Sequence, residues 1–178
     1  MEGGIRVWNG MVAEGPPESG IAYFEAGATA ADMASLAWAL EESTRRFYAH
    51  LADTRPGGDE SDLFRTLVQA EEHHKETLSG INERLTDEPV SRISDRQDRR
   101  IMEGGMELES ALEWVTGKPL SDILDLAIGM EANAFDRYQK MMEAADDPDS
   151  REVFSVIAGE EKRHLARLAD LKDSQVPG

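Results

Sequence analysis

Apolar residues recur at helical spacing in four long stretches of the chain, and this pattern predicts four long helices. The first begins near Thr29, where Thr29 and Asp32 resemble a capping box, and stops at the Arg55-Pro56-Gly57-Gly58 break. The second runs from residue 59 or 61 to about 85, ahead of Pro89. The third spans about 120–145 and the fourth about 149–171, with Asp146-Asp147-Pro148 between them.

The remaining segments predict the domain organisation. Residues 1–28 are rich in Gly and Pro without a sustained period, so they predict an N-terminal arm. Residues 87–118 form a long crossover with its own short helix, Met106 to Val115, and residues 174–178 form a C-terminal tail. We therefore expect one all-α domain over residues 29–173, a four-helix bundle in which two helical hairpins are joined by one long crossover.

Composition excludes several kinds of chemistry. The 178 residues include no cysteine, which rules out disulfides, thiolate zinc sites, iron-sulfur clusters and thiol catalysis. The formal net charge of -17 makes nucleic-acid binding improbable and favours cations as charged partners. The chain shows neither a secretory signal nor a run of membrane-spanning length, so we expect a soluble cytoplasmic protein with no membrane partner.

The two hairpins are copies of one unit. At an offset of 90 residues, apolar positions pair with apolar positions, as Leu40 does with Met130 and Phe64 with Phe154. The same offset pairs polar residues within the apolar stripe: Glu41 with Glu131, Tyr48 with Tyr138, Glu71 with Glu161, and His74 with His164. Taken singly, each of these residues is more often a surface or core residue than a ligand, and only their shared register favours a role as ligands.

Register predicts that the four glutamates point inward and meet in one layer. Each lies four residues after one apolar position of its helix and seven residues before a tyrosine or leucine of the same stripe. The midpoint of Glu41 and Glu71 is Pro56, and that of Glu131 and Glu161 is Asp146. Both midpoints lie in the predicted turns, so all four carboxylates lie roughly 20 Å along their helices from a turn.

Four carboxylates in an apolar interior must hold either protons or cations. Two divalent ions would balance four negative charges, and a Glu-x-x-His pair places both side chains on one helix face. This is the ligand set of di-iron and di-manganese carboxylate bundles. By that template Glu71 and Glu161 bridge two ions, Glu41 and Glu131 are terminal ligands, and His74 and His164 each bind one ion. Iron is the expected metal, with manganese or zinc as alternatives.

Other polar residues near these positions are not proposed as ligands. Tyr48 and Tyr138 either orient a carboxylate through the phenol or only fill the core. His50 and His73 lie off the stripe and are expected in solvent. Glu72 and Glu160, next to proposed ligands, are expected to be surface charges.

The chain resembles the rubrerythrin branch of the ferritin-like superfamily over residues 30–172. The resemblance rests on four segments: Leu40-Glu41-Glu42 followed by Phe47-Tyr48, Ala70-Glu71-Glu72-His73-His74, Met130-Glu131 followed by Tyr138, and Glu160-Glu161-Lys162-Arg163-His164. It implies a ferritin-like fold and a non-haem di-iron protein that reacts with peroxide or dioxygen, often as a homodimer. Rubrerythrins carry a four-cysteine iron site that is missing here, which implies a separate electron-donor protein. They also place a further glutamate where this chain has Ala134.

Three functions follow from these patterns. The first is a di-iron oxidoreductase that reduces hydrogen peroxide or dioxygen at a carboxylate-bridged dimetal site. The second uses the same site as a ferroxidase or for metal storage. The third is a metal-free helical assembly module whose carboxylates are protonated or hydrated.

Overall fold

The computed structural model describes residues 29–55, 57–86 and 100–174, and all its regular elements are helical. These elements are α1 (Ala30–Thr54), α2 (Asp59–Thr86), the 3-10 turn η1 (Glu103–Gly105), α4 (Leu108–Val115), α5 (Leu120–Ala144) and α6 (Pro148–Ser174). The all-α prediction is confirmed. The predicted N-terminal arm, the first part of the crossover with Pro89, and the end of the C-terminal tail lie outside the described residues.

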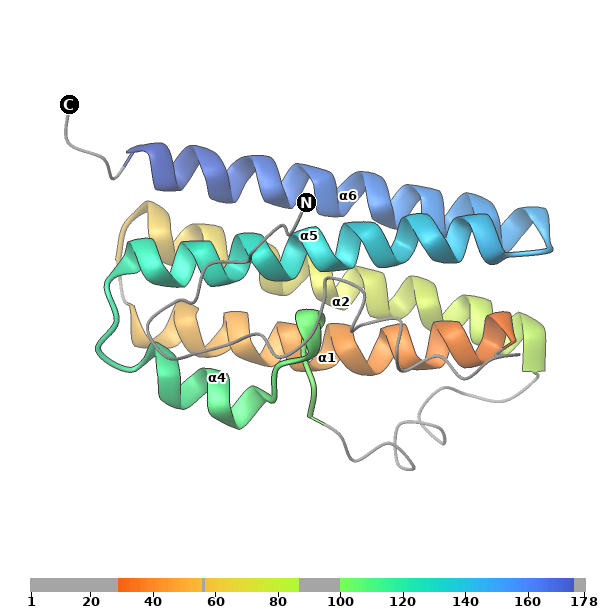
Figure 1. Ribbon diagram of the computed structural model, residues 1–178, viewed down its shortest axis with the longest axis horizontal. Helices are drawn as coiled ribbons and strands as arrows, with labels where there is room; N and C mark the ends of the chain where they lie inside the picture. Colours follow the sequence, from red (N-terminus) through yellow and green to blue (C-terminus); the bar gives the residue numbers. More distant parts are fainter. Residues whose placement is uncertain (1–28, 56, 87–99, 175–178) are drawn as a thin grey trace, which may run out of the picture.

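Four long helices lie side by side along the long axis of the molecule (Figure 1). α1 is antiparallel to α2, and α5 is antiparallel to α6, so each pair is a hairpin. α5 begins at the end of the bundle opposite to the one where α2 stops, so α5 runs in the same direction as α2. This is the arrangement of ferritin-like bundles.

Local chemistry sets the helix boundaries. At the start of α1, the Thr29 side chain accepts a hydrogen bond from the Asp32 N–H, and the Asp32 carboxylate accepts one from the Thr29 N–H, which is the predicted capping box. Gly57 and Gly58 turn the chain into α2 with φ of 99° and 86°, values that disfavour any side chain. α6 begins at Pro148, where a proline costs no helical hydrogen bond.

Two hydrophobic clusters fill the bundle on either side of a central polar layer. One includes Phe47, Phe64 and the buried residues of α4, while the other includes Leu78 and Phe154. On each long helix the proposed ligand positions lie between residues of the first cluster and residues of the second. The polar layer is therefore enclosed by apolar packing at both ends.

The structure corrects two details of the crossover. The short helix begins at Leu108 rather than Met106, and the turn η1, which the sequence did not predict, precedes it. The reason is a closed loop in which the Met102 N–H donates to the Met106 carbonyl over 2.8 Å and the Leu108 N–H donates to the Arg100 carbonyl over 2.7 Å. Gly104 and Gly105 supply the positive φ that this loop needs.

No helix among the described residues is long and apolar enough to cross a membrane.

Candidate metal centre

Six ionisable side chains of the predicted site lie together in the bundle interior. Their exposed fractions are 1% for Glu41, 1% for Glu71, 0% for His74, 1% for Glu131, 1% for Glu161 and 5% for His164. Each of the four long helices contributes at least one glutamate, and α2 and α6 each add a histidine one turn further along. The structure thus brings together all six residues that the sequence proposes as metal ligands.

The six residues divide into two overlapping groups with the spacing of metal ligands. Glu41, Glu71, His74 and Glu161 form one group, and Glu71, Glu131, Glu161 and His164 form the other. Within each group, one donor atom from every residue lies within 4.8 Å of all the others. Glu71 and Glu161 belong to both groups, whereas each remaining glutamate and histidine belongs to one.

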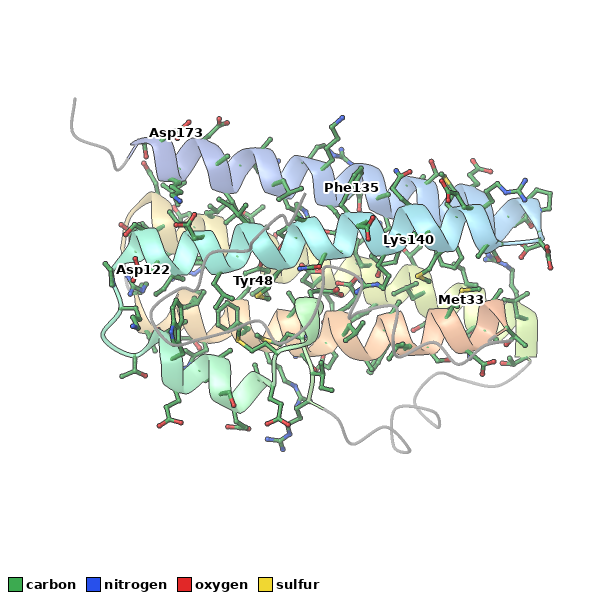
Figure 2. The ribbon with its side chains drawn as sticks, in the orientation of Figure 1. Met33, Tyr48, Asp122, Phe135, Lys140 and Asp173 are labelled. Carbon is green, nitrogen blue, oxygen red and sulfur yellow. The ribbon has the colours of Figure 1, made fainter. Side chains whose placement is uncertain are left out.

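Two tyrosines connect the hairpins across the site. The Tyr48 hydroxyl on α1 donates a hydrogen bond to Glu131 Oε1 on α5, and the Tyr138 hydroxyl on α5 donates one to Glu41 Oε1 on α1. Figure 2 labels Tyr48 in the space between α1 and α5. Each phenol fixes one carboxylate oxygen and leaves the other oxygen on the histidine side. The tyrosines are therefore more than core fillers.

Each histidine directs Nδ1 toward the carboxylates. His74 Nδ1 is 3.2 Å from Glu71 Oε2 and 3.2 Å from Glu161 Oε1. His164 Nδ1 is 3.1 Å from Glu131 Oε2 and 3.2 Å from Glu161 Oε2. The centroids of the two rings are 5.6 Å apart, so the imidazoles flank the same space.

Glu160 is not the simple surface charge that the sequence suggested. Its side chain is 26% exposed, and its Oε2 lies 3.0 Å from His74 Nε2, the ring nitrogen facing away from the carboxylate layer. Residues with this geometry fix the tautomer and the ring orientation of a metal-binding histidine. Glu72 is half exposed and His73 is largely exposed, as predicted.

Burial and closely spaced charges shift the pKa values of the residues in the cluster. Burial, followed by the charge of Glu41, raises the pKa of Glu71 well above its usual range. Burial and the charge of Glu161 raise the pKa of Glu131 to about 8. Hydrogen bonds to Glu131 and Glu161 overcome the opposing effect of burial and raise the pKa of His164 to about 9. In the protein alone, protons therefore take the place of cations.

The donor set fits two divalent cations. Four carboxylates and two neutral imidazoles balance two doubly charged ions, and these ligand types suit iron, manganese and zinc. Glu161 Oε1 is buried and shares His74 Nδ1 with Glu71 Oε2, each at 3.2 Å, so a single ring nitrogen contacts two carboxylate oxygens that a cation would also bind. The space between the helices is thus lined by groups that two metal ions would satisfy.

A buried ion pair beside the cluster was missed at the level of sequence. Arg137 on α5 pairs with Glu103 of η1, and their exposed fractions are 3% and 2%. Arg137 Nη2 also lies 3.5 Å from Glu41 Oε1. The repeat offered a signal for Arg137, because it occupies the position of the buried Phe47 in the first hairpin. No pattern marked Glu103, which a loop delivers.

The fold and the buried cluster define the class: a ferritin-like bundle with a carboxylate and histidine cluster at its centre. A model of the rubrerythrin family matches residues 32–172, and the chain belongs to this family, whose members are di-iron carboxylate proteins. Comparisons with curated proteins and with solved structures gave no match. Ala134 is buried where rubrerythrins place their further glutamate, so α5 supplies one carboxylate to the cluster.

Proposed function

We propose that the cluster holds two iron ions and that the protein is an oxidoreductase that reduces hydrogen peroxide or dioxygen. The observation that carries this proposal is the overlap of two four-residue donor groups that share Glu71 and Glu161. A shared carboxylate is what a bridge between two ions requires. Glu41 with His74, and Glu131 with His164, complete the two positions.

The protein's own residues would perform distinct tasks around the ions. Tyr48 and Tyr138 tie one oxygen of each terminal glutamate and leave the other available as a ligand. Glu160 holds the His74 ring through Nε2 and, being partly exposed, links the buried layer to solvent as a path for protons. The apolar clusters on both sides exclude bulk water. Two ferrous ions, when bound, supply the two electrons that convert hydrogen peroxide and two protons into two water molecules.

The test is anaerobic loading of metal-free protein with ferrous iron, followed by stopped-flow absorbance after mixing with hydrogen peroxide or with air-saturated buffer. We expect two iron ions per chain to be oxidised by one equivalent of peroxide, faster than free ferrous iron. Glu71→Gln should abolish this reaction. Glu72→Gln, which changes the exposed neighbouring residue in the same way, should retain it.

Other outcomes would favour the alternatives. Uptake of many iron ions per chain would indicate storage, in agreement with the acidic net charge of -17. Thermal stability that is indifferent to ferrous, manganous and zinc ions would indicate a metal-free assembly module, because a ligand of the native state must stabilise it. Either result would contradict the proposed oxidoreductase.

Three expectations go with this function. Since the chain has no cysteine, the electrons that restore the ferrous state would come from a separate protein. A homodimer is a further prediction, which light scattering after size-exclusion chromatography would check. A cytoplasmic location is the third, to be checked by cell fractionation.

A further inference from the structure

The loop containing η1 inserts a charged residue into the bundle. Gly104 allows a close approach, because a Cβ there would lie 3.1 Å from Asn133 Nδ2 on α5. The Glu103 N–H faces Thr44 Oγ1 on α1 at 3.4 Å, and the loop thereby spans α1 and α5. The Glu103 side chain is consequently 2% exposed. A closed loop with two glycines of positive φ therefore holds one carboxylate in the bundle interior.

Arg137 connects Glu103 to Glu41, which belongs to only one of the two proposed metal positions. Its Nη1 pairs with Glu103, and its Nη2 lies 3.5 Å from Glu41 Oε1, the oxygen that also accepts from Tyr138. The guanidinium is held over the Tyr138 ring, 4.7 Å from its centroid. In the other hairpin the equivalent position is Phe47, an uncharged and fully buried side chain. The two repeats therefore differ by one positive charge beside a terminal glutamate.

The charges around the site predict how this difference affects metal binding. Glu103 and Arg137 neutralise one another, and the four glutamates of the centre keep the four negative charges that two divalent ions need. The pair is nevertheless a dipole whose positive end faces Glu41. A positive charge close to a ligand repels an incoming cation, and this effect is strong where water is excluded. Glu103 Oε1 and Arg137 Nε have no hydrogen-bond partner among the described residues, a cost that packing alone does not explain.

We propose that Glu103 and Arg137 are a positioning pair that makes the two metal positions unequal, so that the Glu131 and His164 position fills first and the Glu41 and His74 position fills second and more weakly. This inference rests on the proposed dimetal centre. The more weakly held ion would lie on the side of the centre that faces Arg137 and the loop containing η1.

Titration of metal-free protein with Mn²⁺ by isothermal calorimetry tests the inference without any turnover. We expect two dissociation constants that differ by about tenfold, the effect of a partly compensated charge at this distance. His164→Ala should remove the tighter step, and His74→Ala should remove the weaker one. Loss of the weaker step in His164→Ala would overturn the order of filling.

The charge pair itself is tested by removing both charges together, since a lone buried charge would destabilise the fold. In Glu103→Gln/Arg137→Met the two constants should converge to within about threefold, whereas Arg137→Lys, which keeps the charge, should keep them apart. The matched control is Glu42→Gln/Lys75→Met, which removes the ion pair between Glu42 and Lys75, whose Oε2 and Nζ atoms are 2.6 Å apart. These two residues directly follow Glu41 and His74 in the chain. It should leave both constants unchanged.

The results separate this inference from the proposed function. Wild-type protein that binds no second Mn²⁺ ion contradicts the dimetal centre itself. Two ions bound with equal affinity, or an unchanged separation in the double variant, contradict only the role of Glu103 and Arg137. If the double variant does not fold, the two histidine variants still decide the order of filling.

Discussion

The Tyr48 hydroxyl on α1 donates a hydrogen bond to Glu131 Oε1 on α5 and so joins the two hairpins at the metal layer. Burial, followed by the charge of Glu131, raises the pKa of the Tyr48 phenol well above 10, which keeps it a donor. Tyr48→Phe removes this donor and leaves a buried carboxylate oxygen unsatisfied. We expect metal-free protein to lose about 1–3 kcal/mol of unfolding free energy in urea denaturation.

The equivalent variant Tyr138→Phe provides the comparison. It should cost a similar free energy, because Tyr138 makes the same contact to Glu41. Arg137 still donates to Glu41 in that variant, and the loss should therefore be no greater than in Tyr48→Phe. A loss of less than about 0.5 kcal/mol in both variants would show that the phenols only fill space.

Glu160→Gln should weaken metal binding at the position that contains His74. The carboxylate holds the ring through Nε2, and loss of such partners typically costs 10–100-fold in metal affinity. Calorimetric titration with Mn²⁺ should show one of the two binding steps weakened by about that factor. Glu72→Gln is the control, since Glu72 neighbours Glu71 as Glu160 neighbours Glu161 but pairs with Arg45 and Lys75 instead.

The stability of metal-free protein should fall as pH rises from about 5 to 9. Burial, followed by the charge of Glu161, raises the pKa of Glu131 to about 8. Against the effect of burial, hydrogen bonds to Glu131 and Glu161 raise the pKa of His164 to about 9. The folded protein therefore holds protons that the unfolded chain releases near pH 4.5 and 6.5, and this stabilisation is lost as pH passes the folded values. Glu161, whose pKa is lowered by hydrogen bonds to His164 and His74 despite burial, acts in the opposite sense only below that window.

Thermal melts in a chelating buffer at pH 5.5, 7 and 9 would measure this trend. Melts with bound Mn²⁺ should show the reverse or no slope, because the ions replace the protons and bind more tightly as pH rises. A melting temperature of the metal-free protein that rises steadily over this range would contradict the proposed charge state of the cluster.

The hairpin turn and a helix surface offer a pair of glycine substitutions with opposite expected signs. Gly57→Ala places a side chain on a residue whose backbone φ is 99°, with no atom close enough to clash. The variant should destabilise the folded protein by about 1 kcal/mol through backbone strain alone. Gly159→Ala lies in α6 with open space at its Cβ, and should stabilise by about 0.5–1 kcal/mol. Urea denaturation of both variants checks the signs, and two losses would show that packing dominates at Gly159.

The four long helices could be predicted from the sequence because each is specified locally. Apolar periodicity and turn residues act over a few positions, and helix ends such as the Thr29 and Asp32 capping box depend on neighbours three residues apart. The repeat at an offset of 90 then placed the site residues at matching heights, because equal distance from a turn fixes the height in a hairpin. Their function as metal ligands stays a prediction.

Tertiary structure alone decided the features that break this repeat. Glu103 reaches the interior because a closed loop crosses α1 and α5, and no periodicity marks a loop residue. The contact between Glu160 and His74 joins residues 86 positions apart on different helices, so their sequence neighbourhoods did not distinguish it from a surface charge. Local patterns determined which residues face inward, while the packing of the two hairpins determined which inward residues meet. Contacts between side chains depend on the relative placement of whole helices, and that placement is a property of the assembled core.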